Sequence, residues 1–107
     1  MEKIKIRPLS LNSAYRGRRF ATPELKSYKS LLGYLLPKKT PLWGKLELTL
    51  RFGVSSKASD LDNLCKAFLD CLADKYGFND RMIYKISLEK VDVEKEQEFV
   101  EFDITEL

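Results

Sequence analysis

The chain has 107 residues, of which 44% are hydrophobic and 33% charged, and it carries a formal net charge of +3 at pH 7. This balance is typical of one small globular domain and excludes an intrinsically disordered chain. No apolar run approaches the roughly 20 residues that span a bilayer. Residues 1–7 alternate charge with isoleucine, unlike a signal peptide, so we expect a cytoplasmic protein.

Charge is distributed unevenly along the chain. Residues 1–57 contain thirteen Lys and Arg against three acids, a net charge of +10, whereas residues 58–107 contain six against thirteen, a net charge of −7. Such a split indicates a basic surface for a polyanion beside an acidic site for a cation. There is no histidine, and Cys65 and Cys71 are too widely spaced for a CxxC motif, so we expect no zinc site and two core cysteines.

The N-terminal part of the chain predicts a strand, a long loop and a helix. Residues 2–7 alternate polar and apolar side chains, which is typical of a strand. Residues 8–21 form the loop, and loops of this length in compact domains are usually functional or mobile. Thr22 as N-cap and Pro23 at the first helical position begin a helix that Pro37 ends.

The loop contains the densest basic cluster of the chain. Arg16, Arg18 and Arg19 surround Gly17 and follow Tyr15. This cluster favours a DNA-binding arm, with a solvated loop as the alternative.

The remaining elements predict the fold. Residues 45–53 alternate as a strand that Trp43 precedes. We expect this tryptophan to be a packing anchor, with stacking on an exposed base as the alternative. A helix over residues 60–76 has one apolar stripe, formed by Leu61, Leu64, Cys65, Phe68 and Leu72. Residues 82–93 and 98–104 read as two further strands. We therefore expect a single α+β domain over residues 1–107, with a mixed sheet of about four strands and two helices.

Acidic residues gather at the start of the second predicted helix. Asp60 and Asp62 precede Lys66 by six and four positions, and Asp80 follows after a turn at Gly77. Carboxylates are the oxygen ligands that Mg²⁺ prefers, and a lysine one turn away can contact a phosphate. We expect Asp80 to return to this end of the helix. The alternative is a capped helix whose Asp62, Lys66 and Asp70 form an i,i+4 ion-pair ladder.

The chain resembles the RusA-type Holliday junction resolvases, Mg²⁺-dependent endonucleases of phages and prophages. The resemblance is carried by Asp60-Leu61-Asp62-Asn63-Leu64, Lys66-Ala67 and Gly77-Phe78-Asn79-Asp80, and more weakly by residues 8–16. It implies that Asp60, Asp62, Asp80 and Lys66 are catalytic, and that the three aspartates bind Mg²⁺, with Mn²⁺ as a substitute.

The same resemblance implies the substrate and the partners. The substrate is a four-way DNA junction, nicked in two strands of like polarity by a homodimer that acts in recombination and repair, associated with the nucleoid through DNA. We expect DNA contacts from Asn12, Tyr15, Arg16, Arg18, Arg19 and Lys57. Lys57 is the one basic residue shortly before the first aspartate, where the family often has several. The junction affinity of the family therefore does not carry over directly to this chain.

Two other functions fit the same residues. One is a non-catalytic DNA-binding module of phage origin, whose aspartates only cap a helix and form ion pairs. The other is a metal-dependent nuclease that also cuts flaps or replication forks.

Overall fold

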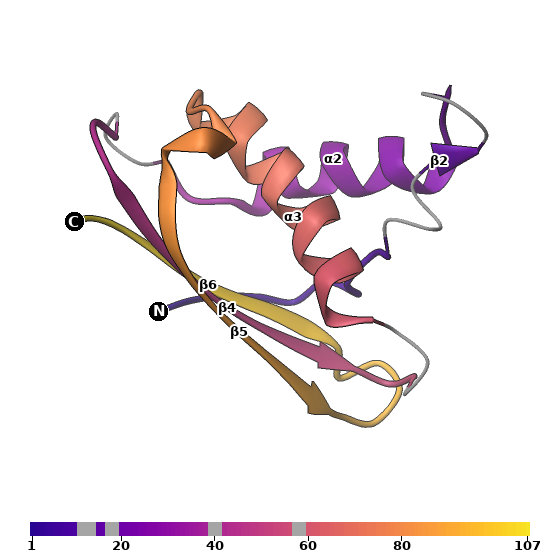
Figure 1. Cartoon of the computed structure of the whole chain (residues 1–107). Coiled ribbons are helices and arrows are strands. Elements are labelled where there is room, and N and C mark those ends of the chain that lie inside the picture. The colour runs from indigo at the N-terminus through magenta and orange to yellow at the C-terminus, as the bar shows by residue number, and fades with distance from the viewer. Residues whose placement is uncertain (11–14, 17–19, 39–41, 57–59) are drawn as a thin grey trace.

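The computed structural model describes residues 1–10, 15–16, 20–38, 42–56 and 60–107. Within them, a four-stranded sheet is covered on one face by two helices (Figure 1). The sheet has the order β1-β6-β4-β5 and consists of β1 (Glu2–Ile4), β4 (Leu46–Val54), β5 (Ile83–Asp92) and β6 (Phe99–Glu106). β4 and β5 are parallel, and the other neighbours are antiparallel. The expected α+β fold with a mixed sheet and two helices is confirmed.

The two helices begin and end close to the expected residues. α2 (Pro23–Leu35) starts after Thr22, whose side-chain oxygen accepts a hydrogen bond from the Leu25 amide at 3.3 Å. α3 (Leu61–Tyr76) has Asp60 as its N-cap. Ser59, the other residue expected to begin this helix, lies outside the described residues.

The core lies between the sheet and the helices. Every second side chain of β4 is almost completely buried, namely Leu46, Leu48, Leu50 and Phe52. Successive strand residues point to opposite faces, so these four share the face that the helices cover. The Phe68 ring of α3 lies 6.1 Å from that of Phe52 and 5.7 Å from that of Phe102, between centroids. Cys65 and Cys71 are buried free thiols, as expected. This packing fixes α3 across β4 and β6, and it therefore positions both ends of the helix.

Some details differ from the expectations. The first strand ends at residue 4, and residues 8–21 include a short antiparallel pair, β2 (Tyr15–Arg16) with β3 (Phe20–Ala21). The predicted anchoring role of Trp43 is wrong, because the residue is 73% exposed. The Trp43 amide donates to the Glu106 carboxylate at 3.2 Å.

Within the described ranges, neither helix has the length and apolar character required to cross a membrane.

Candidate active site

The Asp60 carboxylate at the start of α3 does not serve the capping role that the alternative interpretation gives it. Asp60 has an extended backbone, with φ −80° and ψ 132°, and its side chain makes no capping hydrogen bond in the described part of the chain. Asp62 is exposed in the first helical turn. Thr22, by contrast, does cap α2 through its side chain. The Asp60 carboxylate therefore remains available for another ligand.

The fold places this pair at one edge of the sheet. β4 and β5 are parallel, and α3 connects them, so the helix starts near the carboxyl ends of both strands (Figure 1). Ligands of α/β units commonly bind at such an edge. Lys66 is exposed and lies one turn after Asp62 on the same helix. Asp62 and Lys66 are thus neighbours on a solvent-facing surface.

Asp80 is positioned by the turn that ends α3. Gly77 adopts the left-handed conformation with φ 70°, and its amide donates to the Ala73 carbonyl at 2.8 Å. Phe78 is buried and anchors the turn. Asn79 then accepts a hydrogen bond from the Arg81 amide and begins the short helix η1 (Asp80–Met82). Asp80 is exposed at the start of η1.

This turn takes Asp80 to the opposite end of α3 from Asp60. Asp80 lines a hollow of about 300 Å³ with Asp70, Asp74 and Lys29, and the Lys29 ammonium lies 3.1 Å from the Asp74 carboxylate. At 1.5 Å per residue, about 12 Å of helix separates Asp62 from Asp70. Asp80 therefore does not return to the first turn within the same chain, contrary to our expectation.

Asp70 is the acid that the sequence motif did not single out. Burial raises the pKa of its carboxyl above the ordinary value; Lys66 and Lys29 oppose that shift, and Asp80 and Asp74 add to it. The sequence signal was present, because Asp70 lies two turns after Asp62 on the same helix face. The sequence pattern alone predicts Asp70 only as a member of an ion-pair ladder with Asp62 and Lys66.

The described residues of one chain do not assemble a complete metal site. In the ranges that the structure covers, no group of three or more His, Cys, Asp or Glu side chains is arranged to hold a metal ion. Asp60 and Asp62 together could supply two carboxylates, which is sufficient for Mg²⁺ when water and phosphate oxygens complete its shell.

The predicted DNA-contacting residues fall mostly outside the structural description. Asn12, Arg18, Arg19 and Lys57 lie outside the described residues, and Tyr15 and Arg16 are described only as the backbone of β2. β3, the partner of β2, contacts α2. The DNA contacts therefore stay predictions.

Comparison with known families identifies the chain. Residues 7–102 match the family model described as endodeoxyribonuclease RusA, which includes Asp60, Asp62, Lys66 and Asp80. No curated protein matches the chain. Since the match covers most of the sequence, the protein belongs to the RusA endodeoxyribonuclease family.

Proposed function

We propose that this protein is a Mg²⁺-dependent endonuclease that resolves four-way DNA junctions by paired nicks. Family membership supports the nuclease activity and the junction substrate. The observation that carries the proposal to named residues is the uncapped Asp60 carboxylate beside the exposed Asp62. A residue serving only as an N-cap would accept a backbone hydrogen bond, as Thr22 does.

The donor set at the start of α3 fits a hard cation. Asp60 and Asp62 offer carboxylate oxygens, the ligand type that Mg²⁺ prefers, and both residues are exposed to solvent. When bound, the metal supplies Lewis-acid activation of the attacking water and neutralises charge on the phosphate. Mn²⁺ satisfies the same ligands.

Lys66 would act on the phosphate directly. Its ammonium group, one turn beyond Asp62, donates hydrogen bonds to a non-bridging or leaving oxygen of the scissile phosphate. Asp60 and Asp62 would hold the cation one turn before Lys66 on the same helix. With no histidine in the chain, proton transfer falls to carboxylates and water.

We propose that Asp80 completes this site from a second copy of the chain. Ligands of one Mg²⁺ lie within about 2.1 Å of it, so two oxygens on it are about 4 Å apart at most. Asp80 lies beside Asp70, about 12 Å along α3 from Asp62. A homodimer in which each copy gives Asp80 to the other resolves this separation. Its two-fold axis would also match that of a junction cut twice.

DNA affinity would come mainly from the basic N-terminal half. Residues 1–57 carry a net charge of +10, and the proposed contacts are Asn12, Tyr15, Arg16, Arg18, Arg19 and Lys57. Because neutralised phosphates release counterions, binding should weaken steeply as salt rises.

The decisive experiment uses a labelled synthetic four-way junction and a linear duplex of the same sequence. The wild-type protein and Asp62→Asn are incubated with each DNA in Mg²⁺ and in EDTA, and binding is measured in parallel by gel shift. We expect paired, Mg²⁺-dependent nicks near the crossover, lost in Asp62→Asn while junction binding persists. Asp103→Asn, an exposed aspartate on β6, is the matched control and should nick normally.

Other results point to the other functions. Binding without nicking in Mg²⁺ and Mn²⁺ would leave a non-catalytic DNA-binding module. The separation of Asp80 from Asp62 in one chain would then explain why the protein does not cut DNA. Equal cutting of the linear duplex, flaps and forks would retain the nuclease and remove junction selectivity.

A further inference from the structure

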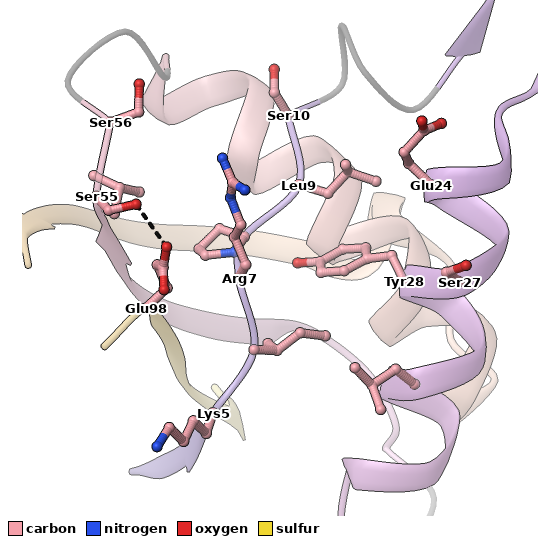
Figure 2. Close-up of a pocket in the computed structure, with 14 residues that line it drawn as sticks. Lys5, Arg7, Leu9, Ser10, Glu24, Ser27, Tyr28, Ser55, Ser56 and Glu98 are labelled. Carbon is pink, nitrogen blue, oxygen red and sulfur yellow. Dashed lines mark hydrogen bonds between the residues drawn. The ribbon is translucent and has the colours of Figure 1, made fainter. Parts of the chain in front are cut away.

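A cavity outside the proposed catalytic set lies beside the end of β4, the strand that leads to α3. It has a volume of about 630 Å³. Residues 5–10, the first turns of α2 and the end of β4 enclose it (Figure 2). Small-molecule sites in proteins commonly have volumes of 300–1,000 Å³, so the cavity is large enough for a nucleobase together with its sugar.

Part of the cavity wall is apolar, and the charges in its lining balance. Pro8, Leu9, Leu31 and Val54 contribute hydrocarbon surface. The charged lining residues that the structure describes are two bases, Lys5 and Arg7, and two acids, Glu24 and Glu98. A phosphate site would have an excess of positive charge. A neutral, planar heterocycle fits this lining better than an anion does.

Glu98 provides a buried hydrogen-bond acceptor on one side of the cavity. Its residue surface is only 9% exposed, and the Ser55 hydroxyl donates to its carboxylate at 2.7 Å (Figure 2). The Ser55 hydrogen bond lowers the pKa of Glu98, and the Glu98 and Glu96 amides and Arg7 act in the same direction. The carboxylate is therefore ionised at neutral pH and can only accept hydrogen bonds.

Tyr28 adds an unsatisfied donor on the opposite side. Its hydroxyl points from α2 toward residues 7–9 (Figure 2), where the Leu9 backbone donates toward its oxygen, and its own proton has no acceptor among the described residues. Only 5% of the residue surface is exposed. Burial raises the pKa of the Tyr28 phenol, so the hydroxyl keeps its proton. An unsatisfied buried hydroxyl is costly, and a polar ligand that reached it would remove that cost.

The cavity is close to the proposed scissile phosphate. Ser56, which lines it, precedes Asp60 by four residues. Four residues span at most about 14 Å when fully extended. That distance corresponds to about four stacked nucleotides of one DNA strand.

We propose that this cavity takes an unpaired nucleobase of the strand being cut, and that Glu98 accepts a hydrogen bond from the amino group of that base. The inference rests on the proposed function and gives it a basis for sequence preference. A base at the branch point costs the least to unstack, and the apolar walls replace the stacking that it loses. Adenine, cytosine and guanine carry an exocyclic amino group, whereas thymine does not, so thymine should be the base least preferred.

The test measures nucleoside binding to the full chain without DNA or metal. Amide NMR spectra of ¹⁵N-labelled protein are recorded during titration with deoxyadenosine, deoxycytidine, deoxyguanosine, thymidine and, separately, inorganic phosphate. We expect shifts at the Arg7, Ser55 and Glu98 amides, with at least one amino-bearing nucleoside binding about tenfold tighter than thymidine.

Matched variants assign the preference to Glu98. Glu98→Gln keeps the size of the side chain but removes its charge, so the preference over thymidine should fall about fivefold or more. Glu94→Gln changes an exposed acid outside the cavity lining and should leave the preference unchanged. Both variants are first checked for a native spectrum, so that loss of the fold is not mistaken for loss of the site.

Three results would overturn the inference: no shift at these amides with any nucleoside, thymidine binding as tightly as the others, or phosphate producing the shifts in place of the nucleosides. The junction assay is run on the same protein. Nicking without nucleoside binding would remove this inference alone, whereas selective nucleoside binding without nicking would support the base site and remove the proposed enzyme.

Discussion

Gly53 of β4 lies directly against the ring of Phe99 of β6, and no space remains between them for a side chain. The two residues are register partners at the end of the sheet where β4 leads toward Asp60. Phe99 is buried, and the Lys3 ammonium lies 4.4 Å from its ring centroid. This contact therefore joins three strands close to the candidate site.

Gly53→Ala should destabilise the protein. A Cβ at this position would overlap the Phe99 ring, and overpacking of this kind typically costs about 1–3 kcal/mol. Urea unfolding followed by circular dichroism measures the change. Gly33→Ala is the control, because nothing lies within 4 Å of its Cβ position in α2, and it should be neutral or stabilising by up to about 1 kcal/mol. Equal effects of the two substitutions would contradict the contact.

Mixing two inactive variants should restore nicking if Asp80 acts across a dimer. Asp62→Asn and Asp80→Asn are each expected to be inactive alone. In a mixed dimer, one site combines the intact Asp62 of one copy with the intact Asp80 of the other. Junction nicking is measured after the variants are mixed and allowed to exchange subunits.

Failure of the mixed variants to nick the junction would contradict a site shared between two copies. If each chain built its own site, both sites of every mixed dimer would carry one substitution, and no activity would return. Size-exclusion chromatography with light scattering confirms in the same samples that the variants are dimers.

Lys66→Gln should lower the nicking rate with little effect on junction binding. Removing one preorganised charge donor from a transition state typically costs about 10²–10³ in rate. Single-turnover nicking, with binding measured by gel shift, separates the two quantities. Lys75→Gln, on the same helix, removes a lysine that donates to the Gly33 carbonyl at 2.8 Å and should nick at the wild-type rate. Comparable losses in both variants would indicate an unspecific charge effect.

The two cysteines should be unreactive in the folded protein. Burial raises the pKa of the Cys71 thiol from its ordinary value of 9.0 to about 11, and Lys29 only partly opposes this; burial also raises the pKa of Cys65. Thiolates are the reactive form. At pH 8, Ellman's reagent should therefore modify the native protein at least about 100-fold more slowly than the protein unfolded in guanidinium.

The raised pKa of the Cys71 thiol should make the folded protein less stable at alkaline pH. Since folding favours the neutral thiol, the stability that Cys71 contributes is complete below pH 9 and is lost as the pH rises toward about 11. Cys71→Ala should lack this part of the decline when unfolding is measured between pH 8 and 11. A decline identical to that of the wild type would contradict the assignment.

Much of the fold was predictable because its elements have strong local patterns. The alternation from Leu46 to Phe52 matches a strand buried on one face, and the Thr22-Pro23 start of α2 is confirmed by the cap. The exposure of Trp43 was not predictable, because an apolar residue before a strand carries no information about which face it meets. The short pair of β2 and β3 also had no periodicity to reveal it.

The candidate site was predictable in its residues and less so in its arrangement. The motif identified Asp60, Asp62 and Lys66, and local helix geometry brings these together. The place of Asp80 depends on the parallel pairing of β4 and β5. Because β5 runs parallel to β4, α3 must return along the sheet, and Asp80 lies between the end of α3 and the start of β5. That pairing is a long-range property. Glu98 was missed for the same reason, since its contact with Ser55 joins residues 43 positions apart.

The last strand in the chain, β6, lies between β1 and β4 in the middle of the sheet. While the chain is being synthesised, β1 and β4 therefore have no common neighbour until residues 99–106 have left the ribosome. The β4-α3-β5 unit can pair earlier, but the aromatic contact between Phe68 and Phe102 must wait. The orientation of α3, and with it the position of Asp60 at its start, is thus fixed only after residues 99–106 have been synthesised and inserted into the sheet.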